Sequence, residues 1–248
     1  MNGCSINIED ALRAYLERNM LEGPAFKAVL FDMDGVLYDS MPRHAKAWKS
    51  VCDEAGIEAV TEEFFAYEGR TGASTIDLLV RRQFGRPATE EESRRLYKRK
   101  TEFFAEMPLA PVMPGAQRAV AVVAESGLPS VLVTGSGQGT LLERLDTDYP
   151  GAFPKWRRVT AYDVSHGKPD PEPYLAGLAK VGAEPFAGIG IDNAPLGVES
   201  SSRAGLFTIG VRTGPIPAGA LMEAGADIEI NSMEDCADII EHLLKMLL

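Results

Sequence analysis

The chain has 248 residues, a formal net charge of -11, and hydrophobic side chains at 45% of its positions. This composition is sufficient for a sizeable core, and the negative charge argues against a nucleic-acid or anionic-membrane partner. No apolar run reaches the roughly 18 residues of a membrane span, and acidic residues interrupt the start where a signal peptide would be apolar. Cys4, Cys52 and Cys236 are widely spaced, which predicts reduced thiols and a cytoplasmic location.

Residues 1–24 are expected to form a helical extension. Asn7 and Asp10 have the spacing of an N-terminal cap, and apolar residues then recur at helical intervals. We expect this helix to pack on the core or to contribute to a self-association surface. The apolar run Ala28–Phe31 that follows is typical of a buried parallel strand.

Residues 41–107 differ from their surroundings, because charged residues are dense and strand-like runs are absent. Apolar residues at helical spacing predict four helices in this insert, and Thr89 with Glu92 is a capping signature for the last of them. The expected helices are Pro42–Ala55, Thr61–Tyr67, Ser74–Phe84 and Thr89–Ala105.

Residues 25–40 and 108–248 have an alternating pattern of strands and helices. Further strands are expected at Ser130–Thr134, Val159–Thr160, Gly188–Ile191 and Phe207–Val211, with helices at Gly115–Ser126, Gly139–Asp146 and Pro171–Val181. This alternation predicts an α/β fold in which a parallel sheet has helices on both faces.

Polar residues lie at the ends of four expected strands. In parallel sheets, ligands bind at the carboxyl ends of the strands. They are Asp32 and Asp34, Thr134 with Gly135 and Ser136, Lys168, and Asp192 with Asn193. Individually, such residues are usually turns or solvated loops, but together they supply the parts that phosphoryl transfer needs. Asp32 would be the nucleophile, forming an aspartyl phosphate, and Asp34 the general acid and base. Attack of one anion on another requires Mg²⁺ between them.

The remaining residues of this group suit phosphate binding. The Thr134 side chain and the backbone of Gly135 and Ser136 would donate hydrogen bonds to phosphate oxygens. Lys168 would add a compact positive charge to an otherwise acidic site.

The order of these motifs resembles the haloacid dehalogenase superfamily, in particular the branch of β-phosphoglucomutase and small-molecule phosphatases. The matching segments are Asp32–Leu37 with Asp39 and Ser40, Val133–Ser136, Gly167–Pro171 and Asp192–Gly197. The resemblance implies a Rossmann-like core, and it makes the insert a helical cap that closes on the substrate. It also gives Asp32, Thr134 and Lys168 the family's nucleophile and phosphate-binding roles.

Two departures from that pattern concern the metal. Asn193 stands where β-phosphoglucomutases have a second acidic residue, and Glu68 in the insert stands where those enzymes have a basic one. Glu68 could therefore restore the missing charge when the cap closes, which gives Asp32, Asp34, Glu68 and Asn193 as the expected Mg²⁺ ligands. This pairing resembles the subgroup that hydrolyses inorganic pyrophosphate.

The sequence analysis therefore favours a Mg²⁺-dependent pyrophosphatase that acts on a small phosphate-containing substrate and is expected to be a monomer. The alternatives are a β-phosphoglucomutase or sugar-phosphate phosphatase, and a non-catalytic protein that binds a phosphate ligand. His44 and Arg70 are further candidates for substrate binding. An interfacial histidine and a solvated arginine are the alternatives for these two residues.

Overall fold

The computed structural model describes residues 7–137 and 139–246. Its centre is a six-stranded sheet in the order β3-β2-β1-β4-β5-β6, in which all neighbouring strands are parallel. The strands are β1 (Ala28–Phe31), β2 (Ser130–Val133), β3 (Arg158–Val159), β4 (Gly188–Asp192), β5 (Phe207–Val211) and β6 (Ile228–Ile230). The winding direction reverses between the central neighbours β1 and β4, which is where open α/β sheets bind their ligands.

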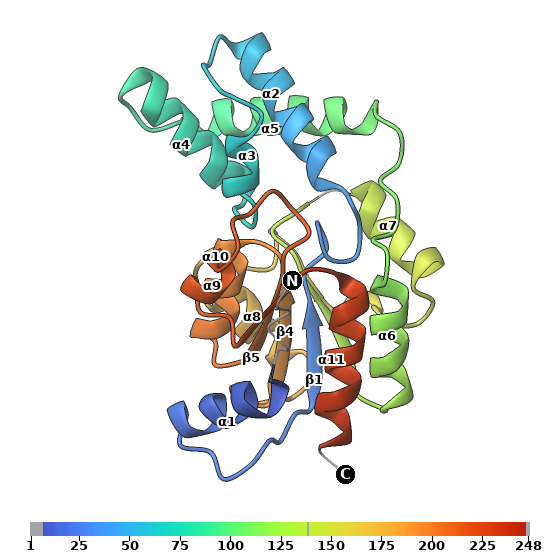
Figure 1. Ribbon diagram of the computed structural model, residues 1–248. Helices are drawn as coiled ribbons and strands as arrows, with labels where there is room; N and C mark the ends of the chain where they lie inside the picture. Colours follow the sequence, from blue (N-terminus) through green and yellow to red (C-terminus); the bar gives the residue numbers. More distant parts are fainter. Residues whose placement is uncertain (1–6, 138, 247–248) are drawn as a thin grey trace, which may run out of the picture.

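Helices cover both faces of this sheet (Figure 1). The helices of the core are α6 (Ala116–Glu125), α7 (Gly139–Asp148), α8 (Glu172–Ala179), α9 (Pro195–Arg203), α10 (Ala220–Glu223) and α11 (Met233–Lys245), with a short 3₁₀ helix at Lys155–Arg157. Val29 and Phe31 belong to the apolar cluster that includes α6 and α11, whereas Ala28 and Leu30 belong to the cluster that includes α8. The alternation follows from the two-residue period of a strand, and it buries β1 on both faces. The predicted α/β class is confirmed.

The helical insert lies over the carboxyl ends of the strands (Figure 1). This cap consists of α2 (Met41–Ala55), α3 (Glu63–Ala66), α4 (Gly72–Phe84) and α5 (Glu90–Ala105). It has its own apolar cluster, which includes Trp48, Phe64 and Leu79. Its two connections to the core run side by side, since the Asp39 N–H donates to the Pro111 carbonyl at 3.0 Å.

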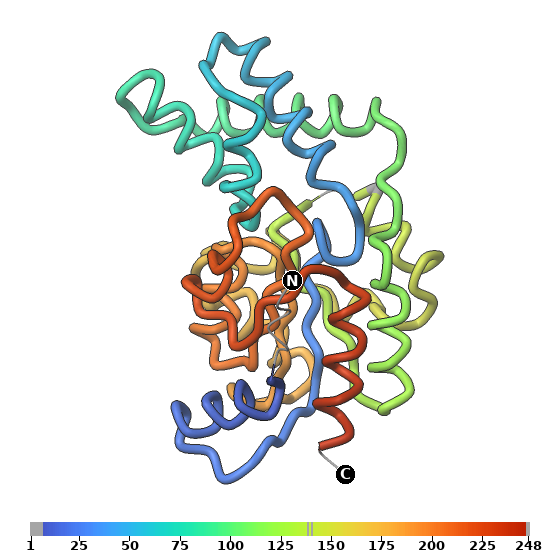
Figure 2. Tube along the Cα trace, in the orientation of Figure 1, coloured from blue at the N-terminus to red at the C-terminus, as the bar shows by residue number. Residues whose placement is uncertain are grey.

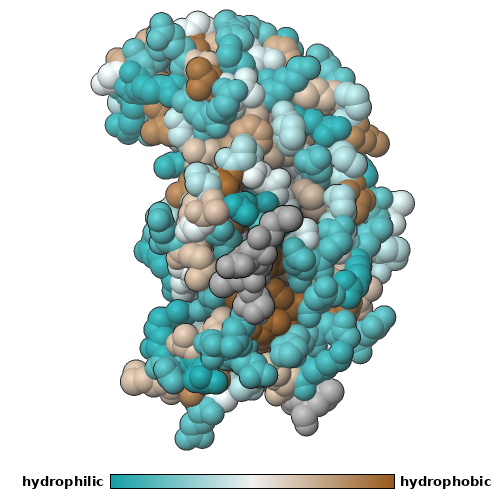
Figure 3. Space-filling model, in the orientation of Figure 1, coloured by the Kyte–Doolittle hydropathy of each residue, from teal (hydrophilic) through white to brown (hydrophobic). Residues whose placement is uncertain are grey.

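Helix α1 (Ile8–Arg18) lies at the opposite end of the molecule from the cap (Figure 2). The Asn7 side chain accepts a hydrogen bond from the Asp10 N–H, as predicted. The buried Tyr15 hydroxyl donates to the carbonyls of Phe186 and Gly205, at 3.1 and 2.8 Å, which ties α1 to the core. Hydrophilic side chains cover much of the face seen in Figure 3.

The structure describes two of the three cysteines that are predicted to be reduced thiols. Cys52 and Cys236 are buried free thiols. Cys4 lies outside the described residues. No helix in the described part of the chain is both long and apolar enough to cross a membrane.

Close packing between β4 and α9 gives a stability prediction. A Cβ added to Gly190 would lie 2.0 Å from Ser201 Oγ and 3.1 Å from Ser201 Cβ. Because this contact is too short, Gly190→Ala is expected to lower the free energy of unfolding by about 1–3 kcal/mol in denaturant titrations. Gly23→Ala is the matched control, since no atom lies within 4 Å of the added Cβ. Equal stability of the two variants would contradict the packing argument.

Candidate active site

Lys168 holds together the ends of two strands. Asp32 directly follows β1, and Asp192 is the last residue of β4. The Lys168 ammonium donates to Asp32 Oδ1 at 2.6 Å, to Asp192 Oδ2 at 2.7 Å and to the Val133 carbonyl at 3.2 Å. All three donors of the ammonium are therefore used.

Asp192 is held more completely than Asp32. The Tyr174 hydroxyl donates to Asp192 Oδ2 at 2.7 Å, and the Ala194 N–H donates to Oδ1 at 3.0 Å. Asp192 thus positions Lys168. In the sequence, Asp192 belongs to one of the four motifs but has no assigned role, and Tyr174 lies outside all four motifs.

Burial and charge act against each other at this cluster. Burial raises the pKa of Asp32 to about 7; the Lys168 ammonium opposes the rise, and the carboxylates of Asp192 and Asp34 add to it. Burial acts to lower the pKa of Lys168, but attraction to Asp192 and Asp32 holds that pKa above its usual value. Lys168 is therefore a fixed cation beside the expected nucleophile.

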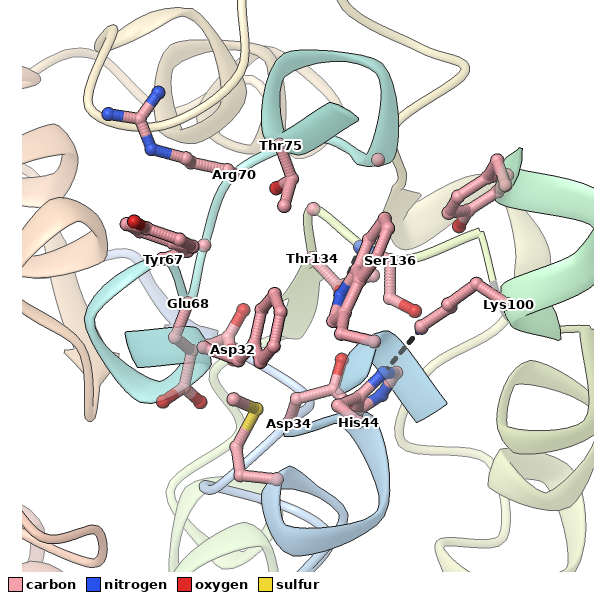
Figure 4. Close-up of a pocket in the computed structure, with 17 residues that line it drawn as sticks. Asp32, Asp34, His44, Tyr67, Glu68, Arg70, Thr75, Lys100, Thr134 and Ser136 are labelled. Carbon is pink, nitrogen blue, oxygen red and sulfur yellow. Dashed lines mark hydrogen bonds and ion pairs between the residues drawn. The ribbon is translucent and has the colours of Figure 1, made fainter. Parts of the chain in front are cut away.

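Asp34 faces the cap and connects to a buried lysine there (Figure 4). Asp34 Oδ1 accepts a hydrogen bond from Ser40 Oγ at 2.5 Å and lies 2.9 Å from His44 Nε2. His44 Nδ1 lies 2.6 Å from the ammonium of Lys100 on α5. The sequence analysis missed Lys100, whose ammonium also lies within 6 Å of three aromatic ring centres, those of Trp48, Tyr97 and Phe104.

The protonation states in this chain follow from the same contacts. Burial and the nearby Lys100 charge lower the pKa of His44, and burial lowers the pKa of Lys100 to about 7. Burial would raise the pKa of Asp34, but its interaction with His44, with the Ser40 hydrogen bond, brings that pKa below its usual value. We assign the proton of neutral His44 to Nε2, because Nδ1 then accepts from Lys100.

Glu68 reaches from the cap to Asn193 in the core. Glu68 Oε1 accepts a hydrogen bond from Asn193 Nδ2 at 2.9 Å, and both residues are buried. Glu68 Oε2 and Asn193 Oδ1 are also buried, and neither has a hydrogen-bond partner in the structure. Burial raises the pKa of Glu68 well above its usual value; the Asn193 hydrogen bond opposes this, and the charge of Asp32 adds to it.

These unpartnered oxygens fit a Mg²⁺ ion, which prefers oxygen ligands. Within the described ranges, no group of three or more His, Cys, Asp or Glu side chains is arranged to hold a metal. A site here would therefore need the Asn193 amide oxygen beside Asp32 and Glu68. Oδ1 of Asp34, the fourth expected ligand, is engaged by Ser40 and His44.

The expected phosphate loop and the cap line a cavity of about 60 Å³ that is open to the surface on one side. Its lining combines the core residues Asp32, Asp34, Thr134, Gly135 and Ser136 with cap residues that include His44, Glu68, Arg70, Tyr97 and Lys100. The Thr134 hydroxyl oxygen accepts a hydrogen bond from the Ser136 N–H at 2.9 Å. The loop therefore turns sharply beside Asp32.

The two further candidates for substrate binding, His44 and Arg70, lie in different environments. His44 is hydrogen bonded between core and cap, as the interfacial alternative predicted. The Arg70 guanidinium donates to Ser74 Oγ at 3.1 Å, and Figure 4 shows it pointing away from Asp32. Arg70 Nε is buried without a partner. Arg70 therefore lines the cavity without its charge facing the expected nucleophile.

The sequence profile of haloacid dehalogenase-like hydrolases matches residues 26–205. The chain belongs to this family. It is 29% identical over 220 residues to a phosphorylated carbohydrates phosphatase from Thermotoga maritima, covering 88% of this chain and 100% of that protein. It is 26% identical over 204 residues to the beta-phosphoglucomutase of Bacillus subtilis, covering 78% and 87% of the two chains.

A solved structure supports the same branch of the family. The protein comes from Bacteroides vulgatus and is provisionally named a beta-phosphoglucomutase. It is 45% identical, with a TM-score of 0.92, and the match covers 97% of this chain and 98% of that one. These relatives support the sugar-phosphate branch of the haloacid dehalogenase-like phosphohydrolases and do not support the expected pyrophosphatase subgroup.

Lys168 lies between the buried carboxyl groups of Asp32 and Asp192, so its removal is expected to cause a large loss of stability. Lys168→Met leaves two buried carboxylates without their positive partner, so the free energy of unfolding is expected to fall by about 3–5 kcal/mol in denaturant titrations. The matched control is Lys180→Met, whose ammonium is partly exposed and lies 3.7 Å from Asp163, and which is expected to cost at most about 1 kcal/mol. A loss no larger than that of the control would refute the assigned role of Lys168.

Proposed function

We propose that the protein is a Mg²⁺-dependent phosphohydrolase that transfers a phosphoryl group first to Asp32 and then to water. The observation that carries this proposal is that two differently held carboxyl groups, those of Asp32 and Asp34, line the same small cavity. Asp32 is paired with the cation of Lys168, whereas Asp34 is hydrogen bonded to His44. Two carboxyl groups in such different environments suit the separate tasks of nucleophile and acid or base.

The first step forms a bond between a carboxylate oxygen of Asp32 and phosphorus while the bond from phosphorus to the leaving group breaks. Lys168 occupies Oδ1 of Asp32, which leaves Oδ2 for the attack. The leaving oxygen takes a proton from Asp34, and the hydrogen bonds of Ser40 and His44 stabilise the carboxylate that remains. In the second step Asp34 removes a proton from water as the water attacks phosphorus and releases Asp32.

Asp32, Asn193 and Glu68 are the side chains that would hold Mg²⁺. When bound, the ion would offset the repulsion between the Asp32 carboxylate and the anionic phosphoryl group. The Thr134 hydroxyl and the Gly135 N–H would donate hydrogen bonds to the phosphoryl oxygens, whereas the Ser136 N–H donates to Thr134 Oγ1.

The names of the relatives make phosphorylated sugars the first substrate class to consider. Inorganic pyrophosphate is a second candidate, because a specific observation favours it. Glu68, which lines the cavity of only about 60 Å³, also accepts a hydrogen bond from Asn193, and this arrangement suits a small anion with its metal. A protein that binds phosphate ligands without turnover is a poorer fit, since Asp32, Asp34 and Lys168 are all present, with Lys168 hydrogen bonded to Asp32.

Phosphate release from purified protein with Mg²⁺ tests the reaction. Wild-type protein is expected to hydrolyse at least one compound of a panel containing pyrophosphate, acetyl phosphate, glycerol 3-phosphate, glucose 6-phosphate and β-glucose 1-phosphate. Asp32→Asn removes the nucleophile and is expected to lower kcat by at least about 10³-fold. Asp53→Asn, on an exposed face of the cap, should keep full activity. Undiminished turnover by Asp32→Asn would exclude the proposed intermediate, and binding without turnover would favour the non-catalytic alternative.

The metal assignment has a test that does not depend on turnover. Glu68→Gln keeps the shape of the side chain but removes its charge, so Mg²⁺ affinity measured by calorimetry is expected to fall about tenfold, or about 1.4 kcal/mol. Glu62→Gln is the matched control, because Glu62 is an exposed cap residue whose charge is remote from the cavity lining. Equal Mg²⁺ affinity in both variants would remove Glu68 from the metal site.

A further inference from the structure

Tyr97 on α5 forms a wall of the cavity in direct contact with the backbone at the start of α4. Both Tyr97 and Gly72 line the cavity. A Cβ added to Gly72 would lie 2.2 Å from both Cδ2 and Cε2 of Tyr97. The ring therefore occupies the space that any side chain at position 72 would need, and the absence of a side chain there lets the ring lie against the helix.

The hydroxyl end of Tyr97 is fixed to the core. The Gly137 N–H donates to Tyr97 Oη at 3.3 Å, and Gly137 directly follows the expected phosphate loop. The other side of Gly137 is also crowded, because a Cβ added there would lie 2.7 Å from the Tyr162 hydroxyl. Tyr97 thus spans from the cap to the core at the edge of the phosphate loop.

The size of the remaining space shows what this wall does. The cavity of about 60 Å³ holds a few water molecules, whereas sites for larger organic ligands commonly measure roughly 300–1,000 Å³. A phosphoryl group bound at Asp32 takes up much of this space. A bulky group attached to it would meet the lining of the cavity, which includes Tyr97.

We propose that Tyr97, seated on Gly72, determines specificity by restricting the closed site to substrates whose leaving group is smaller than a hexose. The proposal rests on the proposed phosphohydrolase function and narrows its substrate class. It accommodates both pyrophosphate and the phosphates of short carbohydrates or polyols. Tyr97 acts by occupying volume, so the ring matters more than its hydroxyl.

The test compares three cap variants by kcat/KM with Mg²⁺, using acetyl phosphate, glycerol 3-phosphate and glucose 6-phosphate. Tyr97→Ala is expected to raise the ratio of glucose 6-phosphate to acetyl phosphate turnover at least about tenfold, since the wall is removed. Tyr97→Phe keeps the ring and should leave the ratio within about twofold. Phe84→Ala is the matched control, because Phe84 is an aromatic residue of α4 that is 52% exposed and outside the cavity lining.

A second measurement separates this proposal from the reaction itself. In an Asp32→Asn background with Mg²⁺, calorimetry gives the ratio of the glucose 6-phosphate Kd to the inorganic phosphate Kd, and Tyr97→Ala is expected to lower that ratio at least about tenfold. If wild-type protein hydrolyses nothing in the panel but this ratio falls, the reaction is wrong and the role of Tyr97 is supported.

Unchanged ratios in Tyr97→Ala, or an equal loss for every compound, would overturn the role of Tyr97 in specificity. Tyr97→Leu, which keeps an apolar side chain but lacks the far half of the ring, provides the same comparison if Tyr97→Ala does not fold.

Discussion

The buried ammonium of Lys168 is the interaction on which the site depends. Adjacent parallel strands β1 and β4 bring Asp32 and Asp192 to the same edge of the sheet, where their charges would repel each other in a poorly solvated environment. Lys168 lies between them and offsets part of this repulsion. Asp34 and Glu68 are also buried near this pair, and burial raises the pKa of Glu68 and of Asp32. A metal cation bound beside these carboxyl groups would favour their charged forms.

The cap supplies charges of both signs to this edge, and close backbone contacts hold it there. Lys100 brings a cation to His44, while Glu68 brings a carboxylate to Asn193. A Cβ added to Gly135 would lie 2.6 Å from the Gly69 carbonyl oxygen, so the cap backbone rests on the phosphate loop itself. Such contacts leave little room between the two parts. The composition of the site therefore depends on the cap resting on the core.

The sequence predicted the centre of the fold better than its edge. β1, β2, β4 and β5 are apolar runs, and their order placed the polar residues after them at one edge of the sheet. The edge strand β6 has only three residues, one of them Glu229, and was missed along with α9, α10 and α11. Lys100 was missed because it follows two other basic residues in α5, and only the packing of the cap distinguishes the buried one. Side-chain directions, such as that of Arg70, depend on the same packing.

The core and the cap carry different kinds of information about function. The motifs that contain Asp32 and Lys168 lie in the core, within the residues that match the family, and in the proposed reaction they bind and transfer the phosphoryl group. The rest of a substrate would then face cap residues that line the cavity, such as Glu68 and Tyr97. Relatives with the same core can therefore act on different compounds. The relatives are named for sugar phosphates, whereas the cavity of this chain is small. These two observations do not conflict, because the names reflect the proposed shared reaction and the cavity volume reflects this chain's own cap.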